Sequence, residues 1–421
     1  NFAVWVYPNL PALAARFAPG PLLLLSNINP RYSGLVGMLA SGGALDQIGV
    51  PFARAHGDVE DEHTFARIRS FVRAAGAVAR LRGQTFGLVG GRPMGMYTAT
   101  ADPAQWMQVF GVDVEHIDQG EIVRLAAEVP ERRVESALQW LEEHIGHIHY
   151  DRAKLTPETL KTQIRATEAM KHLIREHRLD FSGIKAQPEL TNHLCTMDVT
   201  EAFLNDPYDW DGPHEPHVCA TEADMDAAMT MQMLKHLAGT PVLFADVRHY
   251  HRDRGIWDLC NSGEHATYFA GRSLDPRDNL PQVQLYPAEM FFPAGGASVQ
   301  HLATPGDATF ARLTRRAGTY RLAILRGAFV RFDEHTNRDL MEQTTLGWPH
   351  AFAKFACSAE EFLASYGSNH IHAVYGEWVD ELRMVADLLG IETQLYGDDV
   401  RETTARSSSG YNTPQHTAYK E

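Results

Sequence analysis

Residues 217–246 read HVCATEADMDAAMTMQMLKHLAGTPVLFAD, and this stretch indicates how the surrounding chain folds. Its first four residues form a strand-like run, and Thr221 with Asp224 has the pattern of a capping box that begins a helix. The helix buries methionine and leucine side chains and ends at Gly239. A second apolar run then ends at Asp246. The order of strand, helix and strand predicts a βαβ unit with two parallel strands.

Two carboxylates stand where the strands of this unit end. Glu222 falls in the first helical turn, where the helix dipole favours an anion, and Asp246 follows the second strand. Open α/β sheets bind ligands at the carboxyl ends of their strands, and neighbouring strands lie about 4.8 Å apart. One divalent cation could therefore be shared by the two side chains. The structural alternative is that Glu222 serves only the helix dipole, while Asp246 pairs with Arg248 in a turn.

The whole chain divides into three parts with different patterns. Residues 1–108 alternate strand-like runs, beginning at residues 2–7, with a periodic helix at 62–81, and we expect this domain to continue upstream of Asn1. Residues 109–238 form a second α/β domain, in which Thr156 caps a helix. Residues 239–421 are β-rich and end in a polar tail from about Thr403. The prediction is an α/β protein with two Rossmann-like parallel α/β domains followed by a barrel-like C-terminal domain.

Composition and charge exclude several classes of protein. The 421 residues carry a net charge of −15, which argues against binding to nucleic acid or to an anionic membrane surface. No run approaches the roughly 18 apolar residues of a membrane span. Four scattered cysteines without a Cys-x-x-Cys pair favour a reducing cytoplasm over a disulfide scaffold or a cysteine zinc site.

The sequence also resembles the L-fucose isomerase family, whose members often accept D-arabinose. The likeness runs in chain order from about residue 20 to about residue 395. Its most specific part surrounds Glu222 and Asp246, which are 24 residues apart (246 − 222). The matching stretches are Gly90 to Gly95, Tyr208-Asp209-Trp210-Asp211-Gly212, Glu215-Pro216, Ala220-Thr221-Glu222, Phe244-Ala245-Asp246-Val247-Arg248, Asn261-Ser262-Gly263, Gly295-Gly296, Trp348-Pro349 and Gly367-Ser368-Asn369-His370.

The resemblance implies a metal site and a sugar site. The implied ligands of a divalent cation, usually Mn²⁺, are Glu222, Asp246 and His370. Two carboxylates and one imidazole suit such an ion. The residues implied to contact the sugar are Gln187, Trp348 and Asn369. For these three the structural alternatives are a loop cap, a core tryptophan and a turn residue.

The resemblance further implies a homo-oligomer, a hexamer, whose active site lies at a subunit boundary. The family uses an arginine donated across that boundary, which would lie upstream of Asn1. Where well-studied relatives have an aromatic residue after the paired glycines, this chain has Ala297, which would leave room for a different or larger substituent at C6 of the sugar.

The predicted activity is aldose–ketose isomerisation through a cis-enediol intermediate, with Glu222 and Asp246 as the acid/base pair and a monosaccharide as substrate. His370 is expected to be a ligand rather than a base. L-fucose and D-arabinose share their configuration at C2 to C4, so the resemblance does not choose between them. Two alternatives stay open: a metal-dependent aldolase or hydrolase with the same ligands, and a sugar-binding or sensor protein without catalysis.

Overall fold

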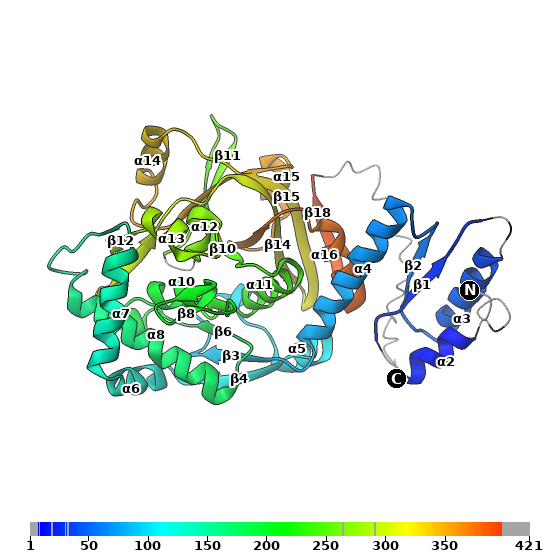
Figure 1. The fold of residues 1–421 in the computed structure, drawn as a ribbon, viewed down its shortest axis with the longest axis horizontal. Helices are drawn as coiled ribbons and strands as arrows, with labels where there is room; N and C mark the ends of the chain where they lie inside the picture. Colours follow the sequence, from blue (N-terminus) through cyan, green and yellow to red (C-terminus); the bar gives the residue numbers. More distant parts are fainter. Residues whose placement is uncertain are drawn as a thin grey trace. The chain divides into compact units, whose positions relative to one another are not determined.

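The computed structural model describes residues 7, 9–17, 20–29, 31, 33–262, 265–289 and 292–397. The chain forms two compact units (Figure 1). Of the described residues, the first comprises those up to Arg80 and Trp378–Thr393, and the second comprises those from Leu81 to Glu377 and Gln394–Gly397. Apart from Tyr7, the strand expected at residues 2–7 lies outside the described residues, as does the tail from Thr403. The predicted division into three domains stays a prediction.

The first unit contains a parallel pair of strands, β1 (Leu23–Ser26) and β2 (Ala53–His56). Its helices are α2 (Leu10–Phe17), α3 (Gly34–Gln47), α4 (Glu62–Leu81) and α16 (Val379–Leu389). The periodicity of the sequence correctly predicts α4. Ser70 on α4 donates a hydrogen bond of 3.0 Å to Glu381 on α16, so a segment from late in the sequence packs within this unit.

The second unit begins with a four-stranded sheet in the order β4 (Asp113–Ile117), β3 (Thr85–Val89), β6 (Phe181–Ile184) and β9 (Cys219–Thr221). All neighbouring strands in it are parallel. The helical segments between these strands are η1 (Tyr97–Ala99), α5 (Pro103–Phe110), α6 (Gly120–Glu128), α7 (Glu131–His144), α8 (Pro157–His177), α9 (Glu189–His193) and α10 (Asp198–Asn205). Every residue of β6 is buried, as expected for a strand covered on both faces.

Thr156 caps helix α8, as its sequence predicts. Its hydroxyl accepts a hydrogen bond of 3.1 Å from the Thr159 N–H, and the Thr159 hydroxyl accepts one of 2.8 Å from the Thr156 N–H. Replacing Thr156 with alanine should lower the free energy of unfolding by about 0.5–2 kcal/mol, because a helix-end N–H loses its partner. Urea denaturation followed by circular dichroism would measure the change. Thr162→Ala, on the same helix but away from its end, is the control, and an equal loss there would contradict the capping role.

The later part of the second unit is an antiparallel β-barrel of six strands. Their order is β14 (Gly306–Arg316), β17 (His370–Tyr375), β10 (Leu243–His251), β11 (Ile256–Cys260), β16 (His350–Phe355) and β15 (Thr319–Phe329). Pairing of β15 with β14 closes the ring, and β18 (Glu392–Tyr396) extends the sheet beside β15. Completely buried side chains, among them Leu243, Phe310 and Ile371, form its apolar core. The predicted fold, with parallel sheets followed by a barrel-like C-terminal region, is therefore confirmed.

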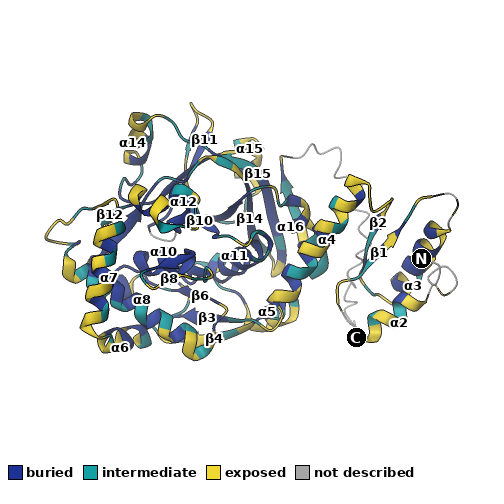
Figure 2. Ribbon diagram, in the orientation of Figure 1, coloured by how far each residue is buried: buried dark blue, intermediate teal, exposed yellow. Residues whose placement is uncertain are grey.

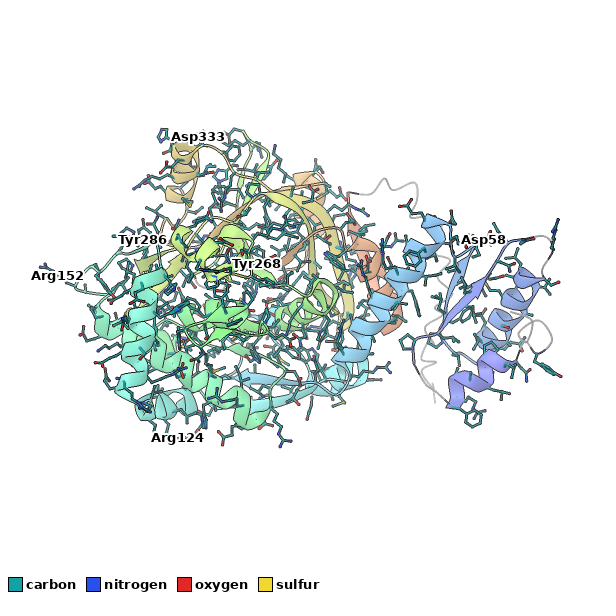
Figure 3. The ribbon with its side chains drawn as sticks, viewed as in Figure 1. Asp58, Arg124, Arg152, Tyr268, Tyr286 and Asp333 are labelled. Carbon is teal, nitrogen blue, oxygen red and sulfur yellow. The ribbon has the colours of Figure 1, made fainter. Side chains whose placement is uncertain are left out.

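Smaller elements complete the second unit. Two short sheets are formed by β5 (His147–Ile148) with β12 (Gln284–Pro287) and β13 (Ala297–Gln300), and by β7 (Tyr208–Asp209) with β8 (Gly212–Pro213). The remaining helical segments are α12 (Tyr268–Gly271), α13 (Pro276–Asn279), η2 (Leu280–Gln282), α14 (Glu334–Glu342) and α15 (Ala359–Ser365). Figure 3 shows Tyr268 within this unit, whereas Arg124 and Asp333 lie at its surface. In the described part of the chain, the helices are too short or too polar to cross a membrane.

Helix α11 (Met225–Ala238) lies between the parallel sheet and the barrel (Figure 1). It packs against β6 and β9 on one side and against β10, β14 and β17 on the other. Twelve of its 14 residues are buried, and Figure 2 shows it dark blue along its length. The cap predicted at Thr221 is wrong, because Asp224 caps this helix by accepting a hydrogen bond of 2.9 Å from the Ala227 N–H. Glu222 therefore precedes the helix instead of lying in its first turn.

Candidate metal centre

The three predicted cation ligands, Glu222, Asp246 and His370, come together in the second unit. Nε2 of His370 lies 3.1 Å from Oε2 of Glu222 and 3.3 Å from Oδ1 of Asp246. The His370 side chain is completely buried, whereas those of Glu222 and Asp246 are 12% and 22% exposed. Both carboxylates thus approach the same imidazole nitrogen, although the donor atoms of the three residues do not all lie within 4.8 Å of one another.

These side chains are supplied by two different sheets. Asp246 on β10 and His370 at the start of β17 are direct partners across neighbouring antiparallel strands, so their side chains lie on one face of the barrel wall. Glu222 follows β9, at the carboxyl end of the parallel sheet. The predicted βαβ unit is wrong, since β10 belongs to the barrel. The reason is that α11 is buried on almost all sides, so the strand after it packs in a second layer instead of returning to the first sheet.

The turn that carries Glu222 has an uncommon backbone. Glu222 and Ala223 have φ angles of +57° and +49°, in the left-handed region that residues with a Cβ atom seldom occupy. Two hydrogen bonds hold this turn: the Ala223 N–H donates to the Ile184 carbonyl at 2.9 Å, and the Asp224 N–H donates to the Thr221 carbonyl at 3.1 Å. Such conformations cost about 1–3 kcal/mol each and cluster at functional sites. Here the turn directs Glu222 toward His370 of the barrel.

A buried ion pair orients His370. Nδ1 of His370 lies 2.6 Å from Oδ2 of Asp224, and a guanidinium nitrogen of Arg312 lies 2.9 Å from the same oxygen. The side chains of Asp224 and Arg312 are 0% and 1% exposed. Because Arg312 keeps Asp224 ionised, Nδ1 carries the hydrogen and donates it to Asp224. When a metal displaces the proton of Nε2, the lone pair of that atom faces Glu222 and Asp246, the usual arrangement behind a metal-binding histidine.

The charges around His370 stabilise a cation. Burial alone would raise the pKa of Asp224, but the Arg312 guanidinium and the hydrogen bond with His370 hold that pKa well below its usual range. Burial alone would lower the pKa of His370, yet the hydrogen bond to Asp224 and the carboxylates of Asp246 and Glu222 raise that pKa well above its ordinary value. Positive charge is therefore favoured at the position of Nε2, which is a requirement for binding a metal cation.

The donor atoms are of the kinds that divalent cations bind. Oε2 of Glu222 and Nε2 of His370 are buried, and neither makes a hydrogen bond of ordinary geometry with the described residues. Leaving such atoms unpaired costs about 1–3 kcal/mol each, and a shared cation would remove this cost. Two carboxylates and an imidazole with further open positions are a suitable donor set for Mn²⁺ and similar ions.

Replacing Asp224 with asparagine should weaken the binding of Mn²⁺ by about 10–100-fold, because the neutral amide orients the His370 ring less firmly. Titration calorimetry of the chelator-treated protein with Mn²⁺ would measure the change. Asp226→Asn is a matched control, because Asp226 is equally buried and ion-paired with Arg315 at 2.8 Å, yet it makes no contact with His370 among the described residues. An equal loss of affinity in both variants would contradict the orienting role of Asp224.

Two asparagines adjoin Asp246. Asn261 donates a hydrogen bond of 3.2 Å to Oδ2 of Asp246, and the amide nitrogen of Asn369 lies 3.5 Å from Oδ1. Asn369, one of the predicted sugar-binding residues, therefore lies beside the three predicted ligands. Asn261 lies in one of the stretches that resemble the L-fucose isomerase family. The sequence alone, however, does not predict that it contacts Asp246.

The other two predicted sugar-binding residues make no hydrogen bond or ring contact with the three ligands among the described residues. Gln187 follows β6, the strand beside β9, and so lies at the same edge of the parallel sheet as Glu222. Oε1 of Gln187 and Nε1 of Trp348 are buried without a hydrogen bond to the described residues, which leaves both able to bind a polar ligand. The Arg248 guanidinium lies 5.2 Å from the Trp348 ring centre. The described residues show no ion pair between Arg248 and Asp246, contrary to the structural alternative for Asp246.

The expected space at Ala297 is not found. Its side chain is completely buried in an apolar cluster with Leu160, Val199 and Val299. Gln163 bonds to both its N–H and its carbonyl, at 2.7 and 3.0 Å. The methyl group of Ala297 thus belongs to the core of the protein, so it gives no support to a pocket for a larger sugar substituent.

A second group of side chains could also hold a metal ion: Asp258, Cys260 and His350. All three are buried, and one ligand atom from each lies within 4.8 Å of the others. The sequence argues against a cysteine metal site, because its cysteines are far apart and form no local motif. The pairing of β11 with β16 brings Cys260 and His350 together, a contact over 90 residues of chain (350 − 260) that local spacing does not reveal.

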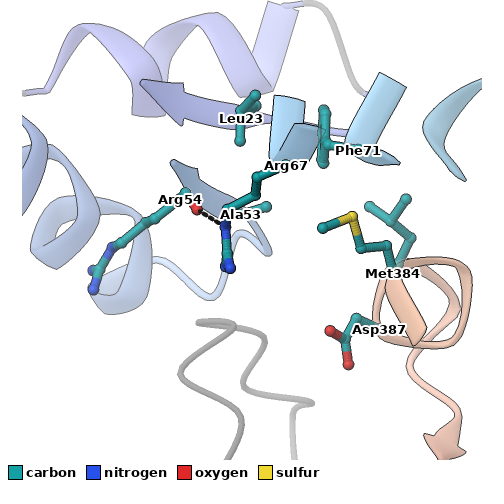
Figure 4. A pocket seen from close by; sticks show the side chains of 8 residues that line it. Leu23, Ala53, Arg54, Arg67, Phe71, Met384 and Asp387 are labelled. Atoms are coloured by element: carbon teal, nitrogen blue, oxygen red, sulfur yellow. Dashed lines mark hydrogen bonds between the residues drawn. The ribbon is translucent and has the colours of Figure 1, made fainter. Parts of the chain in front are cut away.

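Within the first unit, a pocket lies between α4, α16 and the β1–β2 pair (Figure 4). Its lining is largely apolar, with Leu23, Phe71 and Met384, and the Arg67 side chain donates a hydrogen bond of 2.9 Å to the Arg54 carbonyl at its edge. It contains none of the predicted site residues. We assign it no catalytic role.

Comparison with protein families gives three matches in chain order. Residues 1–83 match the model described as L-fucose isomerase, first N-terminal domain. Residues 175–239 match the second N-terminal domain of the same enzyme, and residues 259–396 match its C-terminal domain. Glu222 falls in the second match and His370 in the third, whereas Asp246 lies between them.

Individual relatives are distant but extensive. An L-fucose isomerase of Vibrio vulnificus (strain YJ016) is 25% identical over 86% of this chain and 74% of its own length. One of Bacteroides thetaiotaomicron is 26% identical over 85% of this chain and 73% of its own. One of Escherichia coli O139:H28 is 25% identical over 90% of this chain and 76% of its own.

Proposed function

Because the chain belongs to the L-fucose isomerase family, we propose that it is a metal-dependent aldose–ketose isomerase acting on sugars like L-fucose and D-arabinose. The observation that supports this most strongly is the convergence of Glu222, Asp246 and His370 from two sheets, with Asp224 fixing the imidazole. A purely sugar-binding protein has no need of such a set. The reaction is proposed to proceed through a cis-enediol intermediate.

Glu222, Asp246 and His370 would hold the cation, most suitably Mn²⁺. When bound, the cation supplies Lewis acidity, which makes the hydrogen on C2 of an aldose more acidic. The remaining task for the protein is to move that proton from C2 to C1. His370 is not suited to this task, because Asp224 fixes its Nδ1 hydrogen and its Nε2 lone pair faces the cation position.

Glu222 and Asp246 are the groups that would transfer the proton. They approach Nε2 of His370 from different sheets, so an enediol lying between them would be within reach of a carboxylate on either face. One carboxylate accepts the proton from C2 while O1 takes up a proton, which gives the enediol; a carboxylic acid then delivers a proton to C1 while the hydroxyl on C2 loses its proton, which gives the ketose. Asn261 holds the second oxygen of Asp246 at 3.2 Å and so restricts the rotation of this carboxylate.

We propose that Gln187, Trp348 and Asn369 bind the sugar. Asn369 stands 3.5 Å from Asp246, and the unpaired polar atoms of Gln187 and Trp348 can hydrogen-bond to hydroxyl groups. The Trp348 ring offers an apolar surface for the face of a sugar ring.

We also propose a homo-oligomer, a hexamer, with its active site at a subunit boundary. Support comes from the family resemblance and from α3, which exposes Leu35, Val36 and Leu39 at 41%, 57% and 58%. Such a row of exposed apolar side chains is typical of a surface covered in an assembly. Light scattering after size-exclusion chromatography would give the mass of the assembly.

Metal-dependent turnover tests the proposed activity. The protein is treated with chelator, restored with Mn²⁺, and supplied with aldoses that include L-fucose, D-arabinose and C6-modified hexoses. Ketose that forms only with the metal is the expected result. Cleavage products of lower mass would instead indicate an aldolase or hydrolase, and sugar binding without any product would indicate a sensor.

A further inference from the structure

We propose that Asp258, Cys260 and His350 form a second metal site, separate from that of Glu222, Asp246 and His370, which binds a thiophilic divalent cation of the zinc type. Strand register places the three side chains together. Cys260 on β11 is the direct partner of His350 on β16, and Asp258 lies two residues before Cys260, on the same face of its strand. One ligand atom from each lies within 4.8 Å of the others.

The atoms not needed for the metal are already occupied by hydrogen bonds. Nε2 of His350 lies 2.9 Å from the Thr345 carbonyl, so its hydrogen has an acceptor there. Nδ1 then points to Oδ1 of Asp258, at 2.8 Å. The second oxygen of Asp258 accepts a hydrogen bond of 2.9 Å from the Thr344 hydroxyl. Hydrogen bonds of this kind fix the orientation and tautomer of metal ligands.

The charge of a bound zinc-type ion would be balanced in this interior position. The side chains of Asp258 and His350 are 0% exposed, and Cys260 is completely buried. A carboxylate, a thiolate and a neutral imidazole together neutralise a doubly charged cation, as a buried site requires. The simpler alternative, a hydrogen-bonded His350–Asp258 pair, makes no use of Cys260.

The three side chains leave one position of a tetrahedral zinc site open, and His265 is not among the residues whose ligand atoms meet there. His265 is completely buried, and neither of its ring nitrogens makes a hydrogen bond to the described residues. Zinc in structural sites takes four ligands in tetrahedral geometry from Cys, His and Asp or Glu.

The two metal sites differ in the ions they prefer. The thiolate of Cys260 favours zinc-type ions, whereas the carboxylate-rich set at Glu222 and Asp246 favours Mn²⁺ and Mg²⁺. The sites are nevertheless adjacent, since Cys260 is the direct cross-strand partner of Asp246. A metal at the second site would tie β11 to β16 beside the strand that carries Asp246, and its binding energy would stabilise the folded barrel.

The test uses the full chain, first assayed for metal content after dialysis and then stripped and refilled with Co²⁺. We expect about two metal ions per chain and the near-ultraviolet charge-transfer band of a cobalt–thiolate bond. The band should vanish in Cys260→Ser and persist in Cys357→Ser. It should also persist in Glu222→Gln, which separates this site from the proposed active site.

If Cys260→Ser does not fold, its missing band is not informative. A second variant therefore keeps Cys260 and has alanine in place of the other three cysteines, and it should retain the band. Absence of the band in the wild-type protein, together with only about one bound metal per chain, would overturn the proposal. So would a band that persists without Cys260.

Discussion

Replacing Glu222 with glutamine should lower kcat for ketose formation by about 10²–10⁴-fold, the range that positioned acid/base groups contribute. Glutamine keeps the shape of the side chain but cannot take up a proton. It also removes one of two negative charges next to Nε2 of His370, so the binding of Mn²⁺ should weaken as well. Assays at saturating Mn²⁺ separate the loss of the proton acceptor from the weaker metal binding. Excess Mn²⁺ refills the metal site, but kcat stays low because glutamine cannot accept the proton.

Glu135→Gln is the control for this substitution. Glu135 is a glutamate on the surface of α7, 61% exposed and far from any predicted site residue in the sequence, so its replacement should leave kcat unchanged. Circular dichroism and thermal unfolding would show that both variants are folded. A Glu222→Gln protein with a kcat within a few-fold of the wild type would exclude Glu222 as the acid/base group.

Replacing Arg312 with methionine should lower the free energy of unfolding by about 3–5 kcal/mol, the cost of leaving one partner of a buried ion pair without the other. Arg312 and Asp224 are both inaccessible to solvent, and the distance between them is 2.9 Å. Arg312 also donates a hydrogen bond of 3.0 Å to the Thr98 carbonyl, so the substitution leaves a second, partly buried acceptor without this partner. Chemical denaturation monitored by tryptophan fluorescence would measure the loss.

The matched control for Arg312 is Arg326→Met. Arg326 pairs with Glu377 at 3.1 Å, but their side chains are 39% and 61% exposed. Pairs of this kind contribute about 0–1 kcal/mol. The variant at Arg312 should also bind Mn²⁺ less tightly, because Asp224 then holds the His370 ring without its counterion. If Arg312→Met lowers the free energy of unfolding no more than Arg326→Met does, the buried ion pair does not stabilise the candidate metal centre.

The sequence predicts local structure where one short segment contains all the information. The periodicity of residues 62–81 gives α4, and Thr156 followed by Pro157 gives the start of α8. These elements depend on side chains within one or two turns of each other. Apolar runs with turn residues between them likewise indicate the barrel-like C-terminal region, although the order of its strands does not follow from them.

The site is harder to predict because it depends on packing between distant segments. The pattern Thr221-x-x-Asp224 resembles a cap at Thr221, yet Asp224 is the cap and Glu222 takes a left-handed conformation before the helix. No local signal places β10 in a different sheet from β9. The roles of Asp224 and Arg312 arise from a contact between residues 88 positions apart, and the pairing of Asp246 with His370 is set by the register of the barrel.

The late position of β17 in the chain has a consequence for synthesis on the ribosome. His370 follows Asp246 by 124 residues (370 − 246), which take roughly 6–25 s to add at typical translation rates of about 5–20 residues per second. During this interval the nascent chain already contains both carboxylates but lacks the imidazole that completes the set. The centre can therefore form only when β17 emerges and pairs with β10, so a metal held by all three residues marks a chain whose barrel has closed.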